Sequence, residues 1–324
     1  MDSPPAQARS ALERDRLVEP RPHWEPLRTL QFQPTPCPVC GTDRGTLRFA
    51  KRIKSVEMRY FICATCKALY ANPRATIESL RNLYASADFF EGGTPGYNHL
   101  VYSDFLAGEK YLRMTARDRL SRIVRHRPSG RMLEVACAAG FFLAEAKMIG
   151  YDVSGIEFSA PMAEYASRRW GVPVVADSAE LTPLESDAFD VIASWGVMTI
   201  IRDPVALIEK FYRALKPGGI WAFNTYYYDG ILPTLVGSRW YILVTNFSQL
   251  FTRRLIMDLP ARAGFRLVSR RREMPYTDLM KVSDIVGRHL NAAWLPRALT
   301  TVGVQGLIVK LPLPDVMEYI WQKP

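Results

Sequence analysis

The sequence predicts an α/β protein built on an open, mostly parallel sheet, with a small cysteine-rich unit in front of it. Three observations support this fold class. Residues 131–157 follow the pattern strand, tight turn, helix, strand; further apolar strands recur at 189–195 and 265–271; and two Cys-x-x-Cys pairs lie near the N-terminus. Strands that alternate with helices indicate a parallel sheet covered by helices, and paired cysteines indicate a unit too small to fold on an apolar core alone.

Residues 131–157, RMLEVACAAGFFLAEAKMIGYDVSGIE, carry the most information about function. In an open α/β sheet, ligands bind outside the carboxyl ends of the strands, where a backbone of small residues can approach them closely. The helix that begins near Gly140 offers its N-terminal amides to such a ligand. Glu157 ends the second strand, where its carboxylate can accept hydrogen bonds from both hydroxyls of a ribose. This stretch therefore predicts a nucleoside-cofactor site.

The turn of this unit indicates which nucleoside cofactor would bind. A dinucleotide-binding turn would follow GxGxxG and leave space for a pyrophosphate, whereas residues 136–140 here are ACAAG. Glu134 lies on the strand before the turn, where its charge would repel a phosphate but suits a cofactor that presents a cationic amine.

At these residues the sequence resembles the class I methyltransferases that use S-adenosylmethionine, whose first motif runs acid-x-G-x-G-x-G and whose second strand ends in an acid. Residues 174–178, 189–195, 203–204 and 215–219 match further motifs of the family in the same order. The resemblance implies a Rossmann-like seven-stranded methyltransferase sheet whose last strand is antiparallel. It also implies a set of cofactor-binding residues: Tyr97, Glu134, Ala136, Ala138, Gly140, Glu157, Phe158, Asp177, Ser178 and Trp195.

The match departs from the family at two places. Ala136 and Ala138 replace the first two glycines of the turn, and we expect both alanines at negative φ, where they cost nothing. The alternative is that either position needs positive φ, in which case alanine would strain the turn and weaken cofactor binding. Many family members also carry Glu-His where this chain has Thr199-Ile200, which removes a possible acid–base pair.

Four cysteines form a pattern typical of a structural zinc site. The pairs Cys37/Cys40 and Cys63/Cys66 are separated by about 22 residues, close to the spacing of known zinc ribbons. Each pair can place two thiolates on one metal ion, and four thiolates complete a closed tetrahedral site with no open position for catalysis. Two disulfides are the alternative, and they would leave Cys137 unpaired. We interpret Cys137 as a small residue that packs within the cofactor turn.

Composition describes a soluble globular protein. The chain has 324 residues, of which 48% are hydrophobic and 23% charged. No apolar run approaches the roughly 18–20 residues that a membrane span requires. We see no signal-peptide pattern at the start of the sequence, so we expect reduced cysteines and a cytoplasmic location. The sequence leaves the oligomeric state open.

The net charge of +10 attracts anionic partners. Arginines concentrate between residues 110 and 131 at spacings of three and four, and a further run covers residues 270–272. We expect the first group to form a solvated helix face, with a binding strip for phosphate groups as the alternative. Neither group shows the interleaved aromatic residues of a single-strand nucleic-acid platform.

The chain divides into four predicted parts. Residues 1–36 are expected to form a flexible arm, 37–74 a zinc ribbon, and 75–128 a helical connector or lid. Residues 129–324 are expected to form the S-adenosylmethionine-binding domain. Within that domain we expect insertions at 226–248 and 274–314, a helix at 249–263, apolar helical spacing from 279 to 290, and a final antiparallel strand at 315–322.

Catalytic residues are less well defined than the cofactor site. A base is needed only if the acceptor must lose a proton, and the candidates are His99, Tyr102 and Tyr226. In related enzymes the connector folds over the cofactor, and the resemblance gives Tyr97 a contact with the methionine carboxylate. We expect aromatic residues after the fifth strand to line an acceptor pocket: Trp195, Tyr226, Tyr227, Tyr228, Trp240 and Tyr241.

Three functions remain open. The ribbon together with the cofactor core resembles one bacterial group of methyltransferases that mostly modify small molecules, sugars, lipids or natural products. This favours direct in-line methyl transfer to such an acceptor, and an anionic one would suit the net charge. Zinc ribbons also precede some RNA methyltransferases, so an RNA or protein methyltransferase that uses the basic surface is the second reading. The third is a non-catalytic scaffold that has lost its cofactor.

Overall fold

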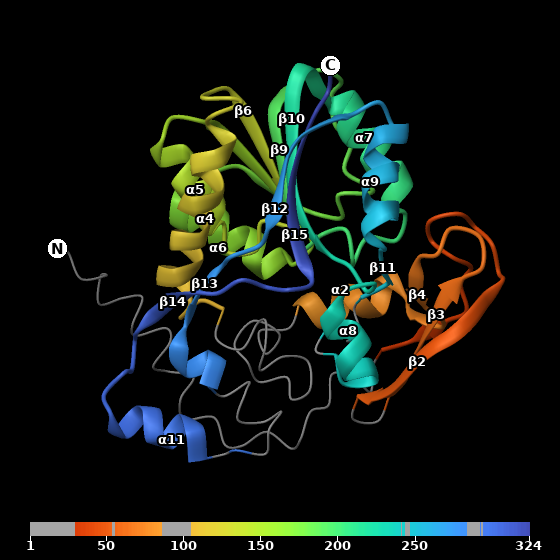
Figure 1. The fold of residues 1–324 in the computed structure, drawn as a ribbon. Helices are drawn as coiled ribbons and strands as arrows, with labels where there is room; N and C mark the ends of the chain where they lie inside the picture. The colour runs from red at the N-terminus through yellow and green to blue at the C-terminus, as the bar shows by residue number, and fades with distance from the viewer. Residues whose placement is uncertain are drawn as a thin grey trace.

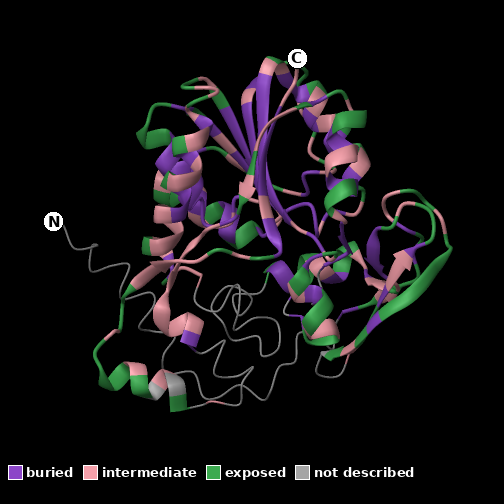
Figure 2. Cartoon of the chain, in the orientation of Figure 1, coloured by how far each residue is buried: buried purple, intermediate pink, exposed green. Residues whose placement is uncertain are grey.

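A computed structural model describes residues 30–53, 56–85, 105–240, 242–243, 247–283, 292 and 294–324. Its main feature is a twisted sheet of seven strands with helices on both faces (Figure 1). Figure 2 shows that the buried residues concentrate in this sheet and in the helix faces turned toward it. The sheet therefore forms the centre of the apolar core and sets the positions of the loops at its edges.

The strand order of the sheet is β12-β15-β10-β9-β6-β7-β8. The five central and outer strands β10, β9, β6, β7 and β8 are mutually parallel, whereas β15 is antiparallel to both of its neighbours. The predicted α/β fold with an antiparallel last strand is confirmed. The strands are β6 Arg131–Val135, β7 Asp152–Glu157, β8 Val174–Ala176, β9 Phe189–Trp195, β10 Leu215–Tyr226, β12 Arg266–Arg272 and β15 Val316–Gln322.

Helices cover the two faces of the sheet. One face carries α4 Glu109–Ile123, α5 Phe141–Met148 and α6 Ala160–Trp170, and the other carries α7 Pro204–Ala214 and α9 Arg253–Arg262 (Figure 1). The residues at the start of α7 explain why this helix begins at Pro204. The Asp203 side chain accepts a hydrogen bond from the Ala206 amide at 2.9 Å, and Pro204 occupies the first helical position, where its missing amide proton costs nothing.

The ribbon is a second, four-stranded sheet. Strands β2 Gly45–Ile53, β3 Val56–Cys63 and β4 Leu69–Ala71 follow one another antiparallel. Its fourth strand, β11 Gln249–Leu250, comes from the chain beyond β10 and pairs with β4. This corrects the helix expected over 249–263: α9 begins at Arg253, because residues 249–250 extend the ribbon and Thr252 caps the helix by accepting from the Leu255 amide at 3.0 Å.

Segments on either side of the ribbon are also ordered. Strand β1 Phe32–Gln33 pairs with β5 Arg74–Ala75, and Leu30 is buried. The flexible arm expected over 1–36 therefore does not extend through these residues. Helix α2 Ile77–Ala85 follows β5 directly and lies between the ribbon and the main sheet (Figure 1).

The two insertions form small secondary-structure elements outside the main sheet. The first contains helix α8 Ile231–Val236 and a single 3-10 turn, η3 Gly237–Arg239. In the second, β13 Tyr276–Asp278 pairs with β14 Ile308–Lys310, and α11 Trp294–Thr301 lies between them in sequence. The helical spacing expected from residue 279 is confirmed as far as 283, after which the described chain is interrupted.

Ribbon and sheet share their apolar cores. Cys63 and Tyr70 of the ribbon belong to the same buried cluster as Val197, Met198 and Phe251. The ribbon is therefore packed onto the main domain and does not form a separate core. Among the described residues, no helix combines the length and the apolar character needed to cross a membrane.

Candidate cofactor site and metal centre

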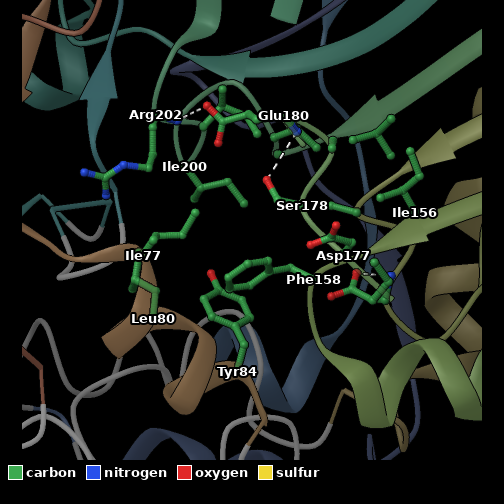
Figure 3. A pocket seen from close by; sticks show the side chains of 18 of the residues that line it. Ile77, Leu80, Tyr84, Ile156, Phe158, Asp177, Ser178, Glu180, Ile200 and Arg202 are labelled. Atoms are coloured by element: carbon green, nitrogen blue, oxygen red, sulfur yellow. Dashed lines mark hydrogen bonds between the residues drawn. The ribbon is translucent and has the colours of Figure 1, made fainter. Parts of the chain in front are cut away.

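A cavity lies at the carboxyl ends of β6, β7, β8 and β9, where an open α/β sheet binds its ligands. Figure 3 shows side chains from helix α2 on one side of this cavity and side chains that follow the strands on the other. Seven of the residues expected to bind cofactor line it: Ala136, Ala138, Glu157, Phe158, Asp177, Ser178 and Trp195.

The backbone of the turn after β6 differs from our expectation. Ala136 has φ 57° and Ala138 has φ 46°, so both alanines occupy the left-handed region. The expectation of negative φ at these positions is wrong. The turn keeps the shape that glycine would adopt freely, and the Cβ atoms make each alanine less stable there by about 1–2 kcal/mol.

Hydrogen bonds to the neighbouring strand hold this strained turn. The Ala136 amide donates to the Ile156 carbonyl at 2.7 Å, and the Ala138 amide donates to Glu157 Oε2 at 2.8 Å. Gly140, with φ 73°, begins α5, and a Cβ there would lie 2.9 Å from the Ala166 Cβ. The turn is therefore held by contacts within the protein. Gly140, at the position of the third glycine of the family motif, is required by packing.

Glu157 lies at the end of β7 and lines the cavity, as expected for a ribose-binding acid. Besides the Ala138 amide, its carboxylate accepts the Ser159 amide at 2.8 Å through Oε1. Burial raises the pKa of Glu157, and these backbone amides act in the opposite direction. A carboxylate has about four acceptor positions, so the backbone amides leave acceptor capacity for hydroxyl groups in the cavity.

The environment of Glu134 shows whether the site fits a sulfonium cofactor that carries a free amino group. Its side chain is 4% exposed, and within the described chain Oε2 has no hydrogen-bond partner. Burial raises the pKa of Glu134 well above its usual value, although the nearby Arg119 opposes this. An unpaired buried carboxylate oxygen is costly, and a cationic ammonium group would satisfy it. Glu134 itself is not among the cavity-lining residues, but the next two residues, Val135 and Ala136, are. The residues present therefore fit S-adenosylmethionine with its ammonium group at this end of β6.

The part of the cavity lined by Tyr84, Phe158 and Asp177 is suited to an adenine ring. Tyr84 meets Phe158 edge-on, with ring centroids 5.7 Å apart (Figure 3). Asp177 forms a 3.2 Å ion pair with Arg81, whose guanidinium also lies 4.8 Å from the Phe158 centroid. The Ser178 amide and Arg81 lower the pKa of Asp177, so an ionised acceptor stands beside an aromatic surface.

Trp195, at the end of β9, also lines the cavity. The Arg119 guanidinium lies 4.1 Å from its ring centroid, and Phe142 contacts the ring edge-on at 5.4 Å. Its indole Nε1 is buried without a hydrogen-bond partner among the described residues. Arg119 therefore connects this aromatic wall with Glu134, the acid expected near the cofactor amine.

Two groups of lining residues were not identified from the sequence. Helix α2 contributes an apolar face, and the turn after β9 contributes a second wall; Glu180 also lines the cavity. The spacing of the α2 residues was the available signal, because positions three and seven apart lie on one helix face. The additional residues are Ile77, Leu80, Tyr84, Gly196, Val197, Ile200, Ile201 and Arg202.

The aromatic residues expected to line an acceptor pocket have mostly structural positions. Trp240 is fully buried and its indole donates to Asp315, which corrects our expectation. The hydroxyls of Tyr227 and Tyr228 donate to the backbone of Pro314 and Lys67, both at 2.6 Å. These bonds connect the chain after β10 to its surroundings. Among the described members of the set, Trp195 is the one that lines the cavity.

The catalytic candidates lie apart from the cavity wall or outside the described residues. Tyr226 packs against Phe247, with ring centroids 6.0 Å apart, and is not among the lining residues. Tyr97, His99, Tyr102 and the pocket candidate Tyr241 lie outside the described residues.

The four cysteines of the ribbon converge on one point. The sulfur atoms of Cys37, Cys40, Cys63 and Cys66 all lie within 4.8 Å of one another, and the closest pairs are 3.5 Å apart. These separations exclude disulfides, whose sulfur atoms are about 2.05 Å apart. A tetrahedral zinc ion with metal–sulfur bonds of about 2.3 Å would separate the sulfurs by about 3.8 Å, so the cluster fits zinc.

Cys137, the remaining cysteine, is buried in the cofactor turn. Burial and the two acids Glu134 and Glu157 raise the pKa of its thiol well above the usual value. A Cβ on Gly155 would lie 2.8 Å from the Cys137 sulfur, which shows how closely the thiol packs. These contacts support a structural role.

The solvated face expected for the arginines of α4 is present only in part: the Arg117 side chain is 59% exposed, whereas three other arginines of the helix are held within the protein. Arg113 pairs with Glu145 of α5, Arg119 with Glu273 at 2.8 Å, and Arg122 with Glu318. Their side chains are only 15–21% exposed. Spacing alone could not reveal this, because the acidic partners lie up to 196 residues away in sequence.

Asp118 belongs to the same network of charges. Burial would raise the pKa of Asp118, but hydrogen bonds from Lys310, Arg122 and Arg271 outweigh it and lower the pKa well below the usual value. Arg271 also donates to Glu318 at 2.6 Å. Three arginines of α4 and Arg271 of β12 are therefore neutralised within the protein, whereas Arg270 and Arg272 of β12 are exposed.

Comparison with known proteins supports the cofactor assignment. The family model described as "Methyltransferase domain" matches residues 109–270, half of the chain. A ubiquinone biosynthesis O-methyltransferase of Ruegeria pomeroyi is 26% identical over 153 residues, which cover 44% of this chain and 62% of that protein. Phosphoethanolamine N-methyltransferase 3 of Arabidopsis thaliana is 35% identical over 101 residues, 29% of this chain and 20% of that protein.

The chain spans about half the length of the first curated relatives that it matches, an uncharacterised protein of Methanocaldococcus jannaschii at 46% and the uncharacterised methyltransferase YdaC of Bacillus subtilis at 51%. Among solved structures, a possible histamine N-methyltransferase of Thermotoga maritima is 21% identical, with a TM-score of 0.46. It covers 69% of this chain and 95% of its own.

Proposed function

Because this chain belongs to the methyltransferase domain family, we propose that it transfers a methyl group from S-adenosylmethionine to a small-molecule, sugar or lipid acceptor by direct in-line attack. The resemblance of the cofactor core to the class I methyltransferases is confirmed by the family match. The identity of the acceptor, and the roles of individual residues, are part of the proposal.

The position of Glu157 is the observation that carries the proposal. Its carboxylate is fixed by the Ala138 and Ser159 amides and still lines the cavity. The ribose hydroxyls would bind there, the ammonium group at Glu134, and the adenine between Phe158 and Asp177. All these residues stand at the carboxyl edge of one sheet.

S-adenosylmethionine supplies a methyl group on a positively charged sulfur, so the group is already activated. The protein has to hold the acceptor in line and exclude water. Trp195 and the apolar side chains of α2, such as Ile77 and Leu80, form a cavity wall suited to excluding water. Proton removal from the acceptor is assigned to no residue.

The charge network of α4 favours a small acceptor over RNA. Arg113, Arg119 and Arg122 are held by carboxylates of the same chain and are not available to a phosphate backbone. The O- and N-methyltransferases among the relatives carry small-molecule names, which agrees with this choice. A cytoplasmic location is proposed with it.

Calorimetric titration of the zinc-loaded full chain with S-adenosylmethionine tests the cofactor. Saturable binding is expected, and no heat at millimolar ligand would favour the scaffold. Transfer of labelled methyl groups to fractionated lipids, glycans, RNA and small metabolites then tests the acceptor. Labelling of RNA alone, with strongly salt-dependent binding, would contradict the small-molecule proposal.

A further inference from the structure

The turn after β9, residues 196–202, forms one wall of the cofactor cavity. Residues of the ribbon sheet donate hydrogen bonds to this turn. Gly196, Val197, Ile200, Ile201 and Arg202 of this turn line the cavity. Such a turn has few backbone hydrogen bonds of its own, so its position depends on neighbouring donors and acceptors.

Gln249 supplies the principal support. It lies on β11, the strand that joins the ribbon sheet beside Tyr70 of β4. Its side-chain amide donates to the Met198 carbonyl at 2.7 Å and to the Ile201 carbonyl at 2.8 Å. The residue is 1% exposed, so water does not compete for these bonds.

The orientation of the Gln249 amide is determined by these two acceptors. If the amide were turned over, its oxygen would face two carbonyl oxygens, which would repel it. In the observed orientation, Oε1 has no hydrogen-bond partner within the described chain. A buried unpaired acceptor is unfavourable, so the two donated bonds outweigh it. The amide is therefore used specifically to hold the turn.

A backbone connection runs parallel to the side chain. The Ala71 amide at the end of β4 donates to the Ser248 carbonyl at 2.9 Å, and the Ser248 amide donates to the Thr199 carbonyl at 2.8 Å. Two successive hydrogen bonds thus link the ribbon strand to the cavity turn. The Tyr228 hydroxyl, which donates to the Lys67 carbonyl beside Cys66, connects the core to the cysteine knuckle itself.

A second bridge joins the ribbon side to the end of the turn. Arg74 of β5 donates to the Arg202 carbonyl at 3.1 Å, and the Arg202 guanidinium donates back to the Ala75 carbonyl at 3.0 Å. On the opposite side, Glu180 Oε1 accepts the amides of Arg202 and Asp203 at 3.0 and 2.8 Å. The turn is therefore clamped between the ribbon and the main sheet.

We infer that Gln249 is a positioning residue through which the four-cysteine ribbon sets the cofactor-facing wall, and with it the affinity for S-adenosylmethionine. The ribbon then acts on cofactor binding without contacting the cofactor. Because the Gln249 side chain acts on the cavity through the Met198 and Ile201 carbonyls and does not itself line the cavity, its replacement displaces the turn without deleting a ligand contact. This inference rests on the proposed function.

The test uses the zinc-loaded full chain and compares Gln249→Met with wild type. Methionine keeps the length and the buried volume but removes both donors. We expect S-adenosylmethionine to bind on the order of tenfold more weakly, the amount that one net hydrogen bond supplies. Zinc content should stay at the wild-type level. Gln305→Met is the matched control, because Gln305 is exposed and donates only to Thr300 nearby.

The outcomes are distinguishable. Weaker binding with unchanged zinc content supports the inference, whereas equal affinity of Gln249→Met and wild type overturns it. If Gln249→Met does not fold, Arg74→Met takes its place, since Arg74 supports the same turn and does not line the cavity. Failure of the wild-type protein itself to bind S-adenosylmethionine would overturn the proposed function and this inference together.

Discussion

The metal centre and the cofactor turn are both tight bends of the chain, but they are built by different means. In the metal centre, four side chains of one type are the ligands, and the backbone serves to bring their sulfur atoms within 4.8 Å of one another. In the cofactor turn, the backbone itself forms the surface, and Ala136 and Ala138 hold positive φ values that alanine disfavours. The ribbon therefore depends on residue identity, whereas the turn depends on a conformation that several residue types can adopt at different cost.

The largest expected effect comes from removing a metal ligand. Cys63→Ser should abolish stoichiometric zinc binding and greatly lower the unfolding temperature, because structural zinc contributes on the order of 10 kcal/mol to the folding of small metal-binding units. Zinc content and thermal unfolding measure this. Cys137→Ala, at a cysteine outside the cluster, should retain zinc; full zinc content in Cys63→Ser would contradict the assignment of the centre.

The second effect concerns Glu157, which accepts a hydrogen bond from the turn and also lines the cavity. Glu157→Gln should weaken S-adenosylmethionine binding by about 100-fold, since two hydrogen bonds to a charged acceptor are altered. Calorimetry measures the affinity. Glu185→Gln is the control, because the Glu185 side chain is 80% exposed. An unchanged affinity in Glu157→Gln would show that the ribose binds elsewhere.

A third effect depends on pH. Burial raises the pKa of Glu134, and a bound ammonium group favours its ionised form. Cofactor binding should therefore release a proton, and affinity should increase as the pH rises toward the raised pKa of this carboxyl. Titrations in buffers of different ionisation enthalpy measure the released proton. In Glu134→Gln the part of the release due to this residue should disappear; a release equal to wild type would remove Glu134 from the site.

The smallest effect tests the strain in the turn. Ala136→Gly and Ala138→Gly should each leave the free energy of unfolding unchanged or raise it by up to about 1 kcal/mol, because glycine adopts positive φ without a Cβ clash. Ala139→Gly provides the contrast. Ala139 is not among the residues with positive φ, so its replacement should destabilise the protein. Chemical denaturation would distinguish the two, and destabilisation by all three variants would mean that the turn carries no strain.

The comparison also explains what could be predicted from the sequence. Cysteine spacing predicted the metal centre, and the acids Glu134 and Glu157 predicted the carboxyl edge of the sheet. In both cases the chemistry of the site requires one residue type, a thiolate or a carboxylate, at a fixed place in the sequence pattern. The φ values of Ala136 and Ala138 could not be predicted, because hydrogen bonds to β7 and to Glu157 impose them from outside the turn.

Long-range partners account for the remaining differences. From the sequence, Arg119 and Arg122 of α4 were expected on a solvated face, but they pair with Glu273 and Glu318, which lie more than 150 residues further along the chain. Likewise, the sequence predicts a helix that begins at Gln249, but in the structure this residue pairs with β4 as part of a strand. In both cases the local pattern was compatible with two structures, and tertiary contacts selected one of them.

The proposed cofactor binding depends most directly on where the nucleoside lies in the cavity. A crystal structure of the zinc-loaded protein with S-adenosylhomocysteine would test it. We predict both ribose hydroxyls within hydrogen-bond distance of the Glu157 carboxylate, the amino group at Glu134, and the adenine beside Phe158. A nucleoside bound away from Glu157, with the cavity between α2 and the strand ends left empty, would contradict the account.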